Sequence, residues 1–181
     1  MESLRGQLLV ASPALLDPNF HRTVVLVVEH GEEGALGLVL NRVSSGEVAE
    51  VGPPLDDLIE PGARIHQGGP VEPAAVLVVA EFDDPEEAAA LVLGDIGLVP
   101  GDGDLEALAD RTRRARVFAG YAGWGAGQLD DELTEESWIV APAEPEDVFS
   151  EFPEELWSQV LRRKGGHYAI VARMPPDPSV N

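Results

Sequence analysis

The stretch RVFAGYAGWGAGQLDDELTEESW, Arg116–Trp138, holds the densest group of glycines and aromatic residues in the chain. It predicts a strand over Arg116–Tyr121, a glycine-rich turn, a helix over Gly127–Glu135 and the start of another strand. A glycine-rich turn before a helix is able to cradle a phosphate, but this spacing matches neither the dinucleotide nor the P-loop pattern. Three acidic residues also occupy the first helical turn, where they would repel a phosphate. We therefore favour glycines that allow close backbone approach beneath Tyr121 and Trp124, with both rings on one side of the turn.

Two β-branched runs nearer the N-terminus predict the centre of a sheet. TVVLVV at Thr23–Val28 and ALGLVLN at Ala35–Asn41 lack polar alternation, so each is expected to be buried on both faces. The connection between them is too short for a crossover, which predicts an antiparallel hairpin. Further predicted strands are Gly6–Ala11, Arg64–Gln67, Ala74–Phe82, Ile96–Val99, Ser137–Ala141 and His167–Arg173. Further predicted helical segments are Glu47–Val51, Leu55–Ile59, Glu86–Leu93, Asp104–Arg114, Glu146–Phe149 and Glu154–Arg163.

Hairpins mixed with helices, without regular βαβ alternation, predict an α+β fold. The length of 181 residues fits a single domain over 1–181, with 175–181 as a frayed tail. The chain has no cysteine, which excludes disulfides, thiolate zinc sites and cysteine nucleophiles and suits a reducing compartment. No apolar run reaches the roughly 18 residues of a membrane span, and the N-terminal stretch fits a first strand better than a signal peptide. We expect a cytoplasmic protein with no membrane association.

The formal net charge is −21, from 12 basic and 33 acidic residues. A negative charge of this size repels the phosphates of nucleic acids, so no direct nucleic-acid binding is expected. Seven of the basic residues fall in two clusters, which form either a positive island for an anionic partner or surface salt bridges; salt bridges are the favoured interpretation. The clusters are Arg111, Arg113, Arg114 and Arg116, and Arg162, Arg163 and Lys164.

Signatures of catalysis and of metal binding are missing from the sequence. The four histidines form no H-x-x-x-H pair, and there is no G-x-S-x-G elbow. The acidic trio Asp130, Asp131 and Glu132 points in three directions on a helix, so it does not converge on one cation. We expect no catalytic residue, no metal and no cofactor.

Five motifs together resemble the AlgH/YqgE-like family, in the family's order and approximate spacing. They are LLVASPALLDPNFHRTVVLVVEH (Leu8–His30), GALGLVLNR (Gly34–Arg42), QGGPV (Gln67–Val71), GYAGWGAGQLDDEL (Gly120–Leu133) and SWIVAPA (Ser137–Ala143). The resemblance covers nearly the whole chain, although the part after Phe149 matches only loosely. Ala126 stands where many relatives have proline.

The resemblance implies an α+β fold with a mixed, largely antiparallel bifurcated sheet, part of it curled into a small barrel, surrounded by helices. It also implies a bacterial cytoplasmic protein, and some family members are labelled transcriptional regulators. It brings no established activity. The motif positions that it nominates for ligand binding are His30, Asn41, Arg42, Gly68, Gly69, Tyr121, Trp124 and Gln128.

Three functions compete at this point. The first is a non-catalytic regulatory or adaptor module that binds an unknown protein partner or a small ligand. The second is an enzyme of unknown reaction, with a site formed by His30, Asn41, Arg42 and the Gly68-Gly69-Pro70 turn around the two aromatic residues. The third, direct DNA binding, is opposed by the net charge and by the absence of a recognisable DNA-binding motif. We rank them in that order.

Overall fold

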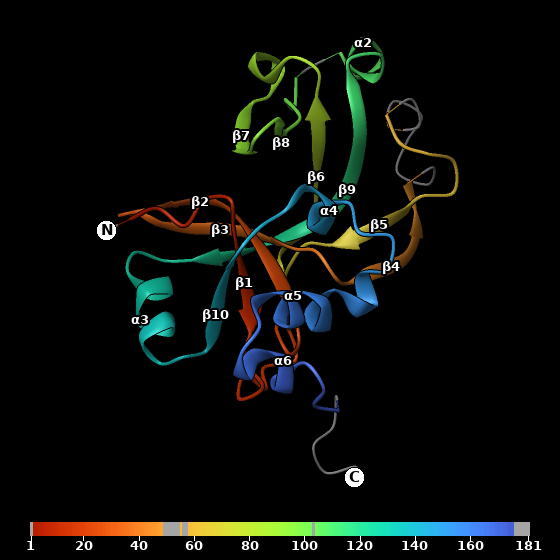
Figure 1. Cartoon of the computed structure of the whole chain (residues 1–181). Helices are drawn as coiled ribbons and strands as arrows, with labels where there is room; N and C mark the ends of the chain where they lie inside the picture. The colour runs from red at the N-terminus through yellow and green to blue at the C-terminus, as the bar shows by residue number, and fades with distance from the viewer. Residues whose placement is uncertain (1, 49–54, 56–57, 103, 176–181) are drawn as a thin grey trace.

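The computed structural model describes residues 2–48, 55, 58–102 and 104–175 and shows an α+β protein (Figure 1). Its strands are β1 (Gln7–Ala11), β2 (Val24–Gly31), β3 (Gly34–Val39), β4 (Val43–Glu47), β5 (Arg64–Gln67), β6 (Val71–Phe82), β7 (Ala90–Leu93), β8 (Ile96–Leu98), β9 (Thr112–Trp124) and β10 (Trp138–Pro142). Its helices are α2 (Leu105–Ala109), α3 (Gln128–Thr134), α4 (Pro145–Val148), α5 (Leu156–Lys164) and α6 (His167–Val171), with 3₁₀ turns at Pro85–Glu87 and Pro153–Glu155.

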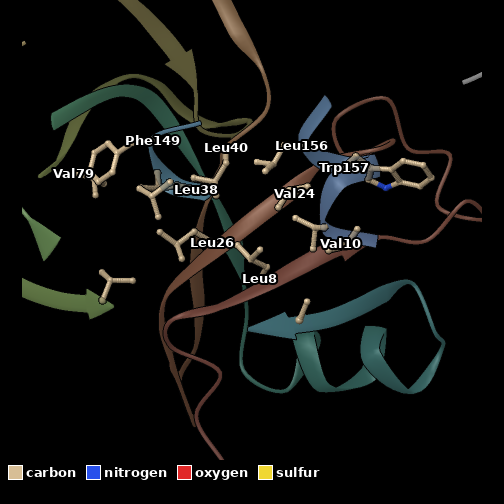
Figure 2. Close-up of a cluster of buried hydrophobic side chains, with 14 of the residues drawn as sticks. Leu8, Val10, Val24, Leu26, Leu38, Leu40, Val79, Phe149, Leu156 and Trp157 are labelled. Carbon is tan, nitrogen blue, oxygen red and sulfur yellow. The ribbon is translucent and has the colours of Figure 1, made fainter. Parts of the chain in front are cut away.

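Strand β2 lies at the centre of the packing and is buried on both faces, as its unbroken apolar run predicts. Val24, Leu26 and Val28 join one hydrophobic core, while Val25 and Val27 join another on the opposite face. Figure 2 shows the first core, in which side chains of β1, β2 and β3 meet Leu156 and Trp157 of α5. The indole Nε1 of Trp157 also donates a hydrogen bond to the Ala11 carbonyl at 2.9 Å, which fixes α5 on β1.

The predicted β2–β3 hairpin is confirmed: the strands are antiparallel, with Gly31 opposite Gly34. Strand β9 then divides the sheet, because it has three strand partners. Its C-terminal end pairs with β3, most of its length pairs antiparallel with β6, and Phe118 and Ala119 pair parallel with β5. The sheet is therefore mixed and branched at the quoted stretch (Figure 1).

The family resemblance implies that part of the sheet curls into a small barrel, and strand pairing does not close the sheet. The strand order β10-β1-β2-β3-β9-β6-β8-β7 is open at both ends among the described residues. The sheet curls, however, and brings β7 back toward the start of β1: a Cβ added to Gly6 would lie 2.7 Å from the Val92 carbonyl oxygen. No strand ladder joins β7 to β1 in the described part of the chain.

Several predicted elements differ from the structure. The helical segment over Glu86–Leu93 is wrong in its second half, which is strand β7, paired with β8 at the sheet edge. The strand over His167–Arg173 is wrong, because these residues form α6, which packs against α5. The helix over Asp104–Arg114 ends at Ala109, and its remainder begins β9, although Asp104 does cap α2 by accepting from the Ala107 amide.

Two further differences concern length and burial. Strand β6 begins at Val71 rather than Ala74, and its N-terminal half is largely exposed, so it is not a fully buried strand. Strand β4 includes Glu47, where a helical turn was expected. The remainder of Glu47–Val51, part of Leu55–Ile59 and nearly all of the 175–181 tail lie outside the described residues. Among the helices of the described chain, none has the length and apolarity needed to cross a membrane.

Candidate functional site

Three of the quoted motifs meet at one surface cavity of about 280 Å³, which we call the motif pocket. Asn19 comes from the loop between β1 and β2, Arg42 follows β3, and Gln67 ends β5. The complete lining is Asn19, Val39, Arg42, Gln67, Gly69, Pro70, Pro73 and Ala119. The pocket therefore gathers side chains that are up to 100 positions apart in the sequence, between Asn19 and Ala119.

Arg42 is the charged side chain of the motif pocket, and the backbone holds it in place. Its Nη1 donates to the Asn19 carbonyl at 2.7 Å, and its Nη2 donates to the His21 carbonyl at 3.2 Å. Burial lowers the pKa of Arg42, and the negative charge of Asp17 opposes that shift. A guanidinium stays protonated in proteins, so the pocket keeps a fixed positive group.

The Gly68-Gly69-Pro70 turn forms the wall of the motif pocket where β5 passes β9. The Gly68 amide donates to the Ala119 carbonyl, and the Gly68 carbonyl accepts from the Val39 amide. Gly69 has φ 155° and Gly120 has φ 73°, both in the region that favours glycine. A Cβ on Gly120 would lie 2.5 Å from the Gly69 carbonyl oxygen, so the two glycines allow the backbones to approach closely.

Asn41 serves the fold beside the pocket and is not part of its lining. Its Oδ1 accepts from the Val24 amide at 2.9 Å, and its Nδ2 donates to the Arg22 carbonyl at 2.8 Å. The two hydrogen bonds join the end of β3 to the start of β2. They also give the Val24 amide and the Arg22 carbonyl the partners that backbone groups need.

His30 and Gln128 lie away from the motif pocket, near the β2–β3 turn and the start of α3. His30 Nδ1 accepts from the Leu4 amide at 3.1 Å, and its Nε2 lies 3.9 Å from Asp130 Oδ1. Gln128 Oε1 accepts from the Gly125 amide at 3.0 Å, and its Nε2 donates to Glu132. Both side chains are occupied by contacts that shape the turn.

Tyr121 and Trp124 lie on opposite faces of the sheet, so the expectation that both rings share one side is wrong. Trp124 belongs to the core that contains Val25 and is 6% exposed, whereas Tyr121 packs against the core of Figure 2. The reason is parity: the segment is extended up to residue 124, and residues three apart in a strand point in opposite directions. The Tyr121 hydroxyl donates to Glu72 Oε2 at 3.2 Å.

Trp124 instead joins Phe20 and Trp138 in an aromatic cluster. The ring centroids lie 6.3 Å apart for Phe20 and Trp124, and 6.1 Å apart for the two tryptophans. Phe20 follows Asn19 directly, so this cluster anchors the loop that supplies one wall of the motif pocket. Trp124 is not part of the pocket lining.

Of the eight nominated ligand residues, the structure brings Arg42 and Gly69 together in the motif pocket, with Gly68 behind them. Pro70 was predicted only as part of the Gly68-Gly69-Pro70 turn of the alternative enzyme site. Asn19, Gln67 and Pro73 were not predicted as site residues, although Asn19 and Gln67 lie inside the family motifs. The signal was present in those motifs, but the choice among their residues depended on which side chains face the cavity.

The two basic clusters do not form a shared positive island. Arg114 Nη2 pairs with Glu146 at 2.9 Å, and Arg163 Nη2 pairs with Asp147 at 2.7 Å, so both clusters reach α4 and each finds a carboxylate there. Arg111 and Arg113 pair with carboxylates elsewhere. The side chains of the described residues include no group of three or more histidines and carboxylates arranged to hold a metal ion.

Comparisons with known proteins cover the part of the chain that contains these motifs. A family model described as AlgH-like matches residues 8–169. A UPF0301 protein of Streptomyces coelicolor is 51% identical over 188 residues, covering 100% of this chain and 97% of its own length. A UPF0301 protein of Chlorobaculum tepidum is 41% identical over 186 residues, covering 97% and 95%.

Two solved structures resemble the fold. The crystal structure of a protein from Corynebacterium diphtheriae has a TM-score of 0.85 at 29% identity and covers 92% of this chain and 90% of its own. The solution structure of the AlgH protein from Pseudomonas aeruginosa, a UPF0301 protein, has a TM-score of 0.72 at 34% identity and covers 95% and 94%.

Proposed function

The chain belongs to the AlgH-like family, which has no assigned activity, and from that premise we propose that it is a non-catalytic adaptor whose motif pocket binds a protein partner. The observation that carries the proposal is the chemistry of the pocket lining. Asn19 and Gln67 have side-chain amides with no partner among the described residues, and Arg42 is already fixed beside them. Three groups are therefore available to hydrogen-bond carbonyl or carboxylate oxygens of a partner.

The lining supports binding rather than catalysis. Its eight described residues include no serine, cysteine, histidine, lysine, tyrosine or carboxylate, so the pocket supplies neither a nucleophile nor a general base. The second candidate, an enzyme, would need its reactive group from outside this lining. No observation at the pocket favours it.

The size and surroundings of the pocket suit a protein segment. About 280 Å³ is just below the roughly 300–1,000 Å³ of small-molecule sites. Leu16, three residues before Asn19, is 67% exposed, and Val43, which follows Arg42, is 42% exposed. Apolar side chains next to polar anchors are typical of protein interfaces.

Charge indicates the kind of partner. A net charge of −21 attracts basic proteins and accelerates their association, while it repels nucleic acid. The partner that we propose is therefore a protein with a basic surface that presents backbone or side-chain oxygens to the motif pocket. The absence of cysteine supports a cytoplasmic location as part of the same proposal.

The test is a differential capture followed by reconstitution. Tagged protein and the double variant Asn19→Ala/Gln67→Ala are incubated with lysate of the producing cells, and the retained proteins are identified by mass spectrometry. Gln159→Ala, an exposed amide on α5, is the matched control. A candidate partner is then purified, and its Kd is measured by calorimetry at low and high salt.

We expect wild type and Gln159→Ala to bind one partner equally. The double variant should bind at least about 5-fold more weakly, since two hydrogen bonds are lost at about 0.5–1.5 kcal/mol each. Binding should weaken as salt rises. A purified partner that binds the double variant with the wild-type Kd contradicts the proposal, as does a capture in which no protein distinguishes the two.

A further inference from the structure

A second cavity, of about 560 Å³, lies on the other side of β5 from the motif pocket, and we call it the histidine pocket. Successive residues of a strand point to opposite faces, so Gln67 lines the first pocket and His66 lines the second. The complete lining is Leu58, Ile59, Glu60, Ala63, Arg64, His66, Arg113, Arg114, Ala115, Arg116, Val117, Glu146, Phe149 and Glu151.

His66 is the first unusual group in this pocket. It is 5% exposed, and neither ring nitrogen has a hydrogen-bond partner among the described residues. Its ring lies 5.6 Å from that of Phe118. Buried polar groups are almost always hydrogen-bonded, and the His66 ring has no more than a weak contact with the Arg64 backbone, so it has hydrogen-bonding capacity for a ligand at this cavity wall.

The imidazole is neutral at pH 7. Burial lowers the pKa of His66 to about 4, the charge of Arg116 adds to that shift, and the backbone of Arg64 opposes it in part. A neutral imidazole has one N–H donor and one acceptor nitrogen. His66 is thus able to donate a hydrogen bond to an oxygen atom of a ligand.

Arg116 is the second unusual group. Its Nη1 donates to the Val148 carbonyl at 3.1 Å, and its Nη2 donates to the Ser150 carbonyl at 3.0 Å. Its neighbours Arg113 and Arg114 pair with carboxylates, but no described carboxylate pairs with Arg116. Burial, and to a smaller extent the charge of Arg114, lowers the pKa of Arg116.

The charges of the lining define the ligand. Among the four arginines of the lining, Arg113 and Arg114 are paired with carboxylates, whereas no described carboxylate pairs with the half-buried Arg116 or with the exposed Arg64. A carboxylate supplies one negative charge for Arg116, whereas a phosphate dianion supplies two. The remaining wall is apolar and is formed by Leu58, Ile59, Val117 and Phe149.

We propose that the histidine pocket binds a small organic monocarboxylate, with its carboxylate on Arg116 and His66 and its apolar body against Leu58 and Phe149. The volume of about 560 Å³ is that of a small-molecule site. This site is separate from the partner-binding motif pocket and does not depend on it.

The experiment uses the full chain with ¹⁵N-labelled histidine. Benzoate and hexanoate are the probes, hexan-1-ol is the uncharged analogue, and inorganic phosphate is the competing anion class. The ring nitrogen signals of His66 are followed by NMR during each titration, and Kd is measured by calorimetry. The ring signals report on the pocket in the wild-type protein, so the test does not depend on a variant that folds.

We expect benzoate or hexanoate, but not hexan-1-ol, to shift the His66 ring signals at about 10 mM or below, the range of a weak single-site ligand. Arg116→Gln and His66→Phe should each raise Kd by about 10-fold, the loss of one charge-assisted hydrogen bond. Arg162→Gln, an exposed arginine on α5, should leave Kd unchanged. Absence of any carboxylate-dependent shift overturns the proposal, and so does tighter binding of phosphate than of both carboxylates.

Discussion

Arg163 and Asp147 form a two-pronged ion pair: Nη1 donates to Oδ1 at 3.0 Å and Nη2 donates to Oδ2 at 2.7 Å. Asp147 is 3% exposed, and its Oδ2 also accepts from the Glu144 amide at the start of α4. One carboxylate therefore caps α4 and fixes the last turn of α5. Arg163 of the C-terminal basic cluster therefore has a structural use, and its guanidinium is not free to bind an anionic partner.

Asp147→Ala should lower the free energy of unfolding by about 1.5–3 kcal/mol, the range for hydrogen bonds to a charged group. Chemical denaturation at neutral pH measures this loss. Asp102→Ala, at an exposed aspartate, is the matched control and should stay within about 0.5 kcal/mol of wild type. If the two variants lose the same stability, the ion pair does not stabilise α4 and α5.

Trp124→Ala should lower stability by about 3–5 kcal/mol, because the side chain is 6% exposed and packs between Phe20 and Trp138. Thermal and urea melts report the change. Phe152→Ala is the control, since Phe152 is 55% exposed and its truncation should cost less than about 1 kcal/mol. A loss below about 1 kcal/mol for Trp124→Ala would mean that the indole is an exposed binding platform rather than core.

Gly120→Ala should be strongly destabilising, whereas Gly125→Ala should be tolerated. Gly120 has φ 73°, which costs an alanine about 1–2 kcal/mol, and the added Cβ would also press on the Gly69 carbonyl. Gly125 has no such φ, and its Cβ would make only ordinary contact with Gln128 at 3.9 Å. Urea denaturation of the pair tests this contrast, and equal stability of both variants would contradict the close approach at Gly69.

Stability should fall as pH is lowered from about 6.5 to about 4 because of His66. Burial lowers the pKa of His66 from its ordinary value of 6.5 to about 4 in the folded protein. Between these two pH values the unfolded chain binds a proton at His66 and the folded protein does not. The stabilisation that is fully present above pH 6.5 is therefore lost as the pH falls toward 4. The full shift corresponds to about 3 kcal/mol. Urea melts of wild type and His66→Phe across this range measure it, and identical pH profiles would show that His66 is not the titrating group.

The protein should show no duplex DNA binding at physiological salt. Non-specific binders reach Kd values of about 10⁻⁴–10⁻⁶ M by neutralising phosphates, and the net charge of −21 opposes that. The ion pairs of Arg111, Arg113, Arg114 and Arg163 also occupy four of the basic side chains. An anisotropy titration that shows micromolar, salt-sensitive binding would contradict this expectation.

Much of the fold was predictable wherever local pattern and tertiary environment agree. The runs at Thr23–Val28 and Ala35–Asn41 are too apolar to face water on either side, so they had to become central strands, and they did. The helix after Gly127 was equally clear, since a glycine with φ 76° marks its start and acidic residues fill its first turn.

Short segments of mixed pattern were not predictable. HYAIVAR has strand propensity, but α5 offers it a packing surface and a hydrogen bond from Ser158 to the Ala172 carbonyl, so it forms a helix. The end of Glu86–Leu93 has helical composition, but β8 offers it a strand edge. In both cases the neighbouring element decided the conformation, because an isolated segment of five to seven residues gains little from either one.

The sequence by itself indicated the family through its motifs, and its composition and periodicity determined the α+β class, the net charge of −21 and the central strands, because these signals do not depend on long-range contacts. Only the tertiary structure decided the sites. It turned Tyr121 and Trp124 to opposite faces through strand parity, used Asn41 to tie β2 to β3, and brought Asn19, Arg42 and Gln67 into one pocket. Side-chain direction and long-range contact depend on register and packing, which no local pattern encodes.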